Sequence, residues 1–401
     1  MDNAVELVSD ADGLGIIGGR RDVERFLASR GLLSLSEDLE LYRLGPLLHT
    51  GAGLAQAGAE VAAHSSRWLK LTEESAQLVK ELGLMETKME GVSYAMLGTP
   101  GNVTGWLKVA QGAGTFLTNP AVLSGVAGLL TQAGMRHEMG ELKKYLATID
   151  KKVDEVLRNQ KNAELQRLIG AWIDIESALA LRREIQRVDP TNWSTVQGRT
   201  QTISDATAGA LLRLNDLAKE VEGARKIGET ARVTARAGDE VAEMLAVLAH
   251  CFELQDALDV LRLDRVREES PADLDAYRLA LRTDRQQRRE RVSRELGHLM
   301  ARLDAVADAA DARVLLHASS ARAVVDTVNR IGTAVENFRA PLGIEGGRDA
   351  LTTTRWRDAA RSADQLKNAA VEVGRHPAVR VGVAGLGVGV AAVVKNAKKP
   401  G

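Results

Sequence analysis

One uncharged stretch restricts how this chain can fold more than any other feature. Residues 109–135 form a run of about 27 residues without a charged side chain, in a protein in which 27% of residues are charged. Pro120 divides the run, and Asn119 before it is a good N-cap, so a helix is expected to begin at Pro120. An arm of about 15 residues rises only about 22 Å as a helix, less than a hydrocarbon core of about 30 Å. The run therefore predicts a hydrophobic hairpin that is either buried in the protein or inserted into a membrane.

The composition of the chain favours helices over sheets. Aromatic residues make up only 3% of the 401 residues, whereas sheet proteins depend on aromatic and β-branched side chains. Several intervals between prolines approach about 70 residues, which leaves room for long helices. We therefore expect an all-α fold, an elongated helical bundle with coiled-coil-like helices, including at least one helix longer than about 40 residues. The formal net charge of −1 provides no global field for nucleic acid, so we do not expect nucleic-acid binding.

The N-terminal part of the chain has a different pattern. Two short apolar runs, residues 5–8 and 14–17, flank a turn-forming sequence and predict a small β-hairpin. A helix over about residues 22–29 should follow, and Gly31 should close it. The acidic N-terminus lacks the basic and apolar regions of a signal peptide, which predicts a cytoplasmic protein, with peripheral membrane association as the further expectation.

Further helices are expected along the rest of the chain. Ser34 and Glu37 have the spacing of a capping box, which predicts a short helix. Another helix is expected to carry Trp68, Leu69 and Leu78. Later helices are predicted over residues 142–187, 211–221, 241–263, 271–338 and 349–373.

An alternating spacing of four and three residues follows the apolar run. This is the pattern of a coiled-coil seam, in which apolar side chains of one helix pack against a partner helix. In the second arm of the hairpin, small residues on nearly one face would let another helix approach closely. The predicted helix-contact residues are Gly125 and Gly128 in the arm, and Leu142, Leu146, Ile149, Val153 and Val156 in the seam.

Two motifs resemble functional sites but have simpler structural interpretations. Residues 13–18 match the dinucleotide fingerprint GxGxxG, but they lie in a predicted strand and no βαβ unit follows, so we interpret them as part of the hairpin. His137, Glu138 and Glu141 begin like the zinc motif HExxH, but the second histidine is replaced and no third ligand appears. This favours a solvated helix face. We therefore predict no catalytic site, cofactor or metal site.

Four arginines, Arg278, Arg282, Arg285 and Arg289, recur at steps of four, three and four on one helix face. Acidic residues interrupt the positive field and no aromatic side chain is available for base stacking. We expect an ordinary solvated, salt-bridged face. Contact with phosphate or lipid headgroups is the alternative.

The order of these elements resembles that of the α-helical pore-forming toxins of the cytolysin A and tripartite haemolysin type. The resemblance rests on residues 109–135 followed by the heptads at 142–156, and it covers about residues 51–338. It implies a non-enzymatic protein that engages a membrane through the hairpin, oligomerising or forming a pore. The alternative is a cytoplasmic scaffold or partner-binding bundle whose hairpin stays buried. The expected partners are thus membrane lipid, a second copy of the chain, or another protein.

Three domains follow from these patterns: an α+β cap at residues 1–48, a helical bundle with the hairpin at 49–340, and a C-terminal helix with a Gly/Val-rich tail at 341–401. The tail contains a second uncharged run, residues 381–394, which either associates with a membrane or docks on the protein. The large apolar side chains of the hairpin are the candidates for insertion into a membrane. They are Phe116, Leu117, Val122, Leu123, Val126, Leu129 and Leu130.

Overall fold

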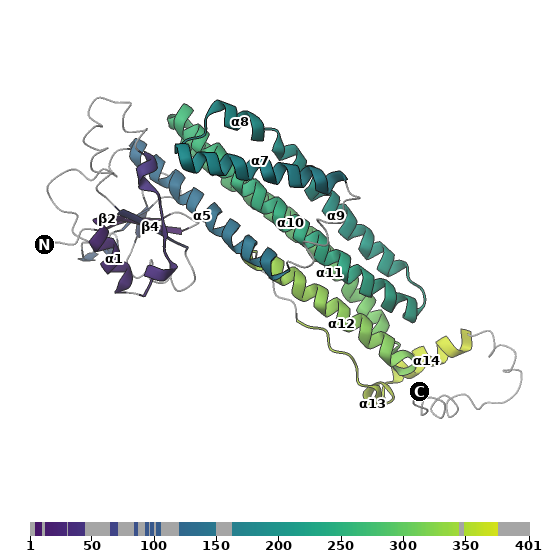
Figure 1. The fold of residues 1–401 in the computed structure, drawn as a ribbon. Helices are drawn as coiled ribbons and strands as arrows, with labels where there is room; N and C mark the ends of the chain where they lie inside the picture. The colour runs from purple at the N-terminus through teal and green to yellow at the C-terminus, as the bar shows by residue number, and fades with distance from the viewer. Residues whose placement is uncertain are drawn as a thin grey trace, which may run out of the picture. The chain divides into compact units, whose positions relative to one another are not determined.

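The computed structural model confirms a predominantly helical protein, since helices account for 82% of the residues that it describes (Figure 1). Helix α10, Ile227–Glu269, has 43 residues, so the expected helix of more than about 40 residues is present. The structure describes residues 5–9, 13–29, 31–44, 65–70, 84–86, 93–95, 97–99, 102–105, 120–149, 163–344 and 349–375.

The chain folds into two compact units, each assembled from separate stretches of sequence. Unit 1 contains Met1–Lys144, Asn162–Ser204 and His250–Gln287. Unit 2 contains Tyr145–Lys161, Asp205–Ala249 and Arg288–Gly401. The three domains that the sequence predicts stay a prediction.

Unit 1 contains an antiparallel sheet of six strands in the order β3-β4-β2-β1-β6-β5. The predicted hairpin is confirmed, because β1 pairs with β2 from Val5↔Gly18 to Ser9↔Leu14. A separate two-stranded sheet pairs β7 with β8. The strands are β1 (Val5–Ser9), β2 (Gly13–Gly18), β3 (Glu37–Asp38), β4 (Ser65–Lys70), β5 (Leu84–Glu86), β6 (Ser93–Ala95), β7 (Leu97–Thr99) and β8 (Asn102–Gly105).

Strands β1, β2 and β4 of the larger sheet bury side chains on both faces. Side chains alternate along a strand, so neighbouring residues point to opposite faces. One face packs on helix α1, Arg20–Ala28, through Leu14, Ile16 and the helix residue Leu27. The other face carries Val8, Ile17 and Trp68 and packs on helix α5, Pro120–Thr148. The helix predicted at residues 22–29 is confirmed, and Gly31 follows it with a positive φ of 68°, as expected for the glycine that closes a helix.

Two helix predictions in this region are wrong. Trp68 and Leu69 lie in strand β4, where they pair with Gly15 and Leu14 of β2 and are buried on opposite faces of the sheet. Pairing with β2 therefore overrides the local helix signal. Ser34 and Glu37 do not form a capping box, because residues 33–35 form the 3₁₀ turn η1 and Glu37 enters strand β3. Leu78 lies outside the described residues.

Helix α5 begins at Pro120, as the sequence predicts. The helix predicted over residues 142–187 is wrong in its continuity, because α5 ends at Thr148 and Ile149 forms a turn. The next described helix is α7, Ala163–Ile185. Asp189 caps helix α8, Pro190–Val196, by accepting hydrogen bonds from the backbone N–H groups of Thr191 and Asn192.

The remaining helices confirm part of the predicted pattern. The predictions at residues 211–221 and 241–263 fall within α9 (Arg199–Gly223) and α10 (Ile227–Glu269), which lie side by side where both belong to unit 2 (Figure 1). The helix predicted at residues 271–338 is interrupted. It comprises the 3₁₀ turn η4 (Pro271–Asp273), α11 (Leu274–Asp311) and α12 (Val314–Arg339), after which η5 covers Ala340–Leu342.

The interruption near Asp311 has a tertiary cause. The side-chain carboxylate of Asp311 accepts a hydrogen bond from the backbone N–H of Thr354 at 2.9 Å. The backbone carbonyl of Asp311 accepts one from Gln365 Nε2 at 2.9 Å. The helix predicted over residues 349–373 starts later than expected, because the backbone of Leu351 exchanges hydrogen bonds with the side chain of Asn329, and it is divided between residues 359 and 363. Only α13 (Trp356–Ala359) and α14 (Ala363–Arg375) are helical there. The tail at residues 381–394 lies outside the described residues.

Candidate functional site

The second arm of the predicted hairpin is a buried part of helix α5. Every side chain from 122 to 135 is buried, and no charged residue occurs among them. A helix that is apolar all round belongs either to a protein core or to a membrane. Of the candidates for membrane insertion, Phe116 and Leu117 lie outside the described residues. The others are buried, at 6% exposure or less: Val122, Leu123, Val126, Leu129 and Leu130.

Two glycines of strand β2 have close neighbours: Gly15 lies against α5, and Gly13 lies against strand β4. A Cβ atom on Gly15 would lie 2.8 Å from Leu130 Cδ2, and one on Gly13 would lie 2.3 Å from Trp68 Nε1. Real Cβ atoms essentially never approach other atoms this closely, so a larger residue at either position would force its neighbours to shift. The GxGxxG sequence is therefore strand β2 itself, which confirms its interpretation as part of the hairpin.

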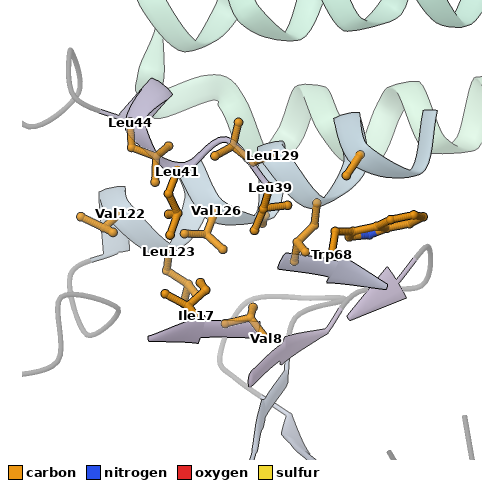
Figure 2. Close-up of a cluster of buried hydrophobic side chains, with 13 residues drawn as sticks. Val8, Ile17, Leu39, Leu41, Leu44, Trp68, Val122, Leu123, Val126 and Leu129 are labelled. Carbon is orange, nitrogen blue, oxygen red and sulfur yellow. The ribbon is translucent and has the colours of Figure 1, made fainter. Parts of the chain in front are cut away.

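A short segment after α1 covers another side of the apolar part of α5. We call residues 36–44 the strap; they include β3 and the 3₁₀ turn η2, Leu41–Leu44. Its side chains Leu39, Leu41 and Leu44 join a cluster with Val122 and Val126 of α5 (Figure 2). The strap is fixed at its start, where Arg67 Nε of β4 donates a hydrogen bond to Ser36 Oγ at 2.9 Å.

Ion pairs hold the outer edge of the strap to α5. Arg136 Nη1 lies 2.5 Å from Glu40 Oε2, and His137 Nδ1 lies 3.2 Å from Glu37 Oε1. The hydrogen bond with His137 lowers the pKa of the Glu37 carboxyl below its ordinary value, against the opposing effect of burial. The His137 ring also packs against Trp68, with ring centroids 5.3 Å apart.

A buried cluster of charges holds the inner edge of the strap. Arg43 Nη2 of η2 donates a hydrogen bond to Asp264 Oδ2, although the two residues are 221 positions apart. Arg182 of α7 and Arg267 of α10 also pair with Asp264. Gln132 of α5 donates to Asp264 Oδ1 at 2.8 Å and to the Val260 carbonyl at 3.1 Å. The strap, α5, α7 and α10 are thus connected through one carboxylate. We call these five residues, Arg43, Gln132, Arg182, Asp264 and Arg267, the Asp264 cluster.

The predicted helix-contact residues have different surroundings. Gly128 faces α11, because a Cβ atom there would lie 3.3 Å from Leu274 Cδ2. Gly125 is buried, as are Leu142 and Leu146, whereas Ile149 is only partly buried in the turn after α5. Val153 and Val156 lie outside the described residues.

Each residue of the zinc-like motif pairs with a different side chain. His137 pairs with Glu37, Glu138 with Arg285, and Glu141 with Lys144. Within the described part of the chain, no group of histidine, cysteine, aspartate or glutamate residues has the arrangement of a metal site.

The salt bridges predicted for the arginine face of α11 are present at Arg278 and Arg285, but the prediction that this face is solvated is wrong. Arg278 and Arg285 are buried, and Arg282 and Arg289 are partly buried. Arg285 forms hydrogen bonds with both Asp256 and Glu138, so this face turns towards α10 and α5. The sequence patterns did not predict the Asp264 cluster. The one weak signal in the sequence is that charged residues occupy helix positions where the periodicity predicts apolar ones.

Comparison of the chain with protein-family models, with curated proteins and with solved structures finds no match. The resemblance to α-helical pore-forming toxins therefore stays a prediction. Among the described helices, none has both the length and the apolar character required to cross a membrane.

Proposed function

We propose that this protein is a non-enzymatic helical protein that engages a membrane through the apolar part of α5, residues 122–135, after the strap moves away. One observation carries the proposal: this uncharged helical segment is buried on all sides, and part of its cover is a short segment attached by side-chain pairs and by the short β3–β4 pairing. The strap contains no long helix, so it can separate from α5 without unfolding one. Exposed apolar surface of this kind favours lipid or another apolar partner.

The proposal includes association between copies of the chain. Leu142 and Leu146 continue the apolar side of α5 towards the predicted coiled-coil seam. Exposed segments of several copies would form an oligomer or pore at the membrane, as the resemblance implies. The first arm of the hairpin would supply the remaining apolar length.

The second candidate is a scaffold or partner-binding bundle in which α5 is permanently buried. Gln132 favours it, because its side chain is 1% exposed and bonds to both Asp264 and the Val260 carbonyl. Removing α5 from this environment breaks these bonds and leaves Asp264 without one of its donors.

Sedimentation with phospholipid vesicles tests the proposal on four forms of the full-length chain. Arg43→Ala removes the inner attachment of the strap, so we expect more binding than for the wild type. Leu123→Arg places a charge in the apolar segment, at about 2.5 to 3.5 kcal/mol if that position reaches the centre of the bilayer, so binding should fall roughly 100-fold. Leu212→Arg is the matched control, because Leu212 is 65% exposed in α9.

Circular dichroism establishes that each form is folded. If Leu123→Arg does not fold, the difference in vesicle binding between Arg43→Ala and the wild type still tests membrane engagement. Absence of vesicle binding by the wild type and by Arg43→Ala, with and without mild urea, would refute membrane engagement and support the scaffold.

A further inference from the structure

The Asp264 cluster contains more hydrogen-bond donors than acceptors. Oδ2 of Asp264 accepts hydrogen bonds from Arg43 and Arg182. Oδ1 accepts from Gln132 at 2.8 Å and lies 3.0 Å from Arg267 Nη2. A carboxylate offers about four lone-pair positions, whereas each guanidinium carries five N–H donors. One saturated carboxylate therefore faces three guanidinium groups.

Arg182 has a hydrogen-bond donor that no acceptor in the cluster satisfies. Its side chain is 6% exposed, and its Nη2 atom is buried with no hydrogen-bond partner among the described residues. Arg267 is also strongly desolvated, and burial lowers the pKa of its guanidinium despite the attraction of Asp264. Buried cations of this kind are stable only with compensating negative charge.

Acidic groups near the cluster compensate only in part. Glu40 lies 3.3 Å from Arg43, but it also pairs with Arg136. Burial raises the pKa of Glu268, which weakens its ability to compensate Arg267. The three arginines thus retain an excess of positive charge and of donors.

We propose that Arg43, Arg182 and Arg267 form a binding site for a phosphate group, and that Asp264 occupies this site when the strap covers α5. Guanidinium groups match phosphate oxygens in geometry and bind them with two parallel hydrogen bonds. Arg43 belongs to the strap, whereas Arg182 and Arg267 belong to α7 and α10, so a shift of the strap that keeps Arg43 within reach of the other two arginines opens the site. A free phosphate and a lipid headgroup share this chemistry. The proposal does not depend on membrane engagement, because phosphate binding is measurable in solution.

Thermal unfolding of the full-length chain tests the site, with inorganic phosphate compared with chloride at the same ionic strength. We expect phosphate to raise the Tm of the wild type by about 2 °C or more, and to raise it further in Asp264→Asn, which removes the competing charge. Arg182→Lys keeps the positive charge but loses the guanidinium geometry, so the response should disappear. The matched control is Arg302→Lys, which alters an arginine that pairs with Glu222 in unit 2.

Vesicles distinguish the two sources of phosphate. Stronger binding of Asp264→Asn than of the wild type to phosphatidic acid vesicles, but not to phosphatidylcholine vesicles, would support a lipid headgroup as the ligand. A response to inorganic phosphate alone would support a free phosphate compound.

Two results would overturn the proposal. One is the absence of a phosphate-specific rise in Tm for both the wild type and Asp264→Asn. The other is an equal rise in all four proteins, which would indicate a general effect of the salt on protein hydration. If Arg182→Lys fails to fold, the difference between Asp264→Asn and the wild type provides the test.

Discussion

The two units of this protein bury different kinds of polar side chain. In the described part of the chain, the buried polar residues of unit 2 are three threonines, Thr230, Thr234 and Thr327. Among the described residues, every buried charged side chain belongs to unit 1: Arg43, Glu138, Arg182, Glu253, Asp256, Asp259, Asp264, Arg267, Arg278 and Arg285.

Unit 2 carries an exposed network of charged side chains. Arg213 lies 2.8 Å from Glu220 and forms a 3.0 Å hydrogen bond with Glu240, and Arg236 pairs with both glutamates. These side chains are between 27% and 60% exposed. Surface pairs are screened by water and contribute little to stability.

The two units differ in the interactions on which their interiors depend. Buried ion pairs pay a desolvation penalty that their attraction offsets only when the geometry is good, so they add little net stability. A missing partner, however, leaves a buried charge without compensation. The interior of unit 1 therefore depends on particular charged partners, whereas that of unit 2 depends on apolar packing. The candidate functional site lies in unit 1, whose interior depends on buried charged partners.

The largest expected effect comes from removing the central carboxylate of unit 1. Asp264→Ala leaves three buried arginines without their shared acceptor, so we expect a loss of about 3 to 5 kcal/mol in the free energy of unfolding. Urea denaturation followed by circular dichroism measures this loss. A decrease below about 1 kcal/mol would show that water reaches the arginines, and the contrast between the two interiors would fail.

A smaller effect should appear in unit 2 at high pH. Burial raises the pKa of Tyr145 to about 12, and its ring packs against Phe338 at a centroid distance of 6.2 Å. Because the folded pKa exceeds the unfolded value of 10.0, Tyr145 stabilises the fold fully below about pH 10 and loses this contribution as the pH rises through 12. The loss approaches roughly 2.7 kcal/mol for a shift of about two units.

Tyr145→Phe provides the check on this assignment. The variant cannot ionise at this position, so its stability should decline less between pH 10 and pH 12 than that of the wild type. Equal declines in the two proteins would mean that Tyr145 ionises as freely in the folded chain as in the unfolded one.

The smallest effect is expected from the surface network of unit 2. Glu240→Gln removes a charge that pairs with Arg213 and Arg236, and we expect a loss of only about 0.2 to 1 kcal/mol. The loss should become smaller still in high salt, which screens exposed charges. A loss as large as that of Asp264→Ala would contradict the distinction between surface and buried pairs.

Local signals in the sequence predicted several elements well. Proline at the first helical position placed the start of α5 at Pro120, and alternating apolar residues placed β1 and β2. Local sequence signals gave wrong predictions where contacts with distant parts of the chain determine the structure. Trp68 is in a strand because β2 pairs with it, and α11 ends near Asp311 because Thr354 and Gln365 bond to that residue.

Local patterns were enough to predict that α5 is a helix whose uncharged first part must avoid water, because helix caps and hydrophobic periodicity act over a few residues. What covers that segment depends on tertiary packing. The strap, Gly15 of β2 and the Asp264 cluster come from distant parts of the chain, and Arg43 bonds to Asp264 across 221 residues. Whether a charged side chain is solvated or buried depends on such long-range packing, which no local pattern encodes.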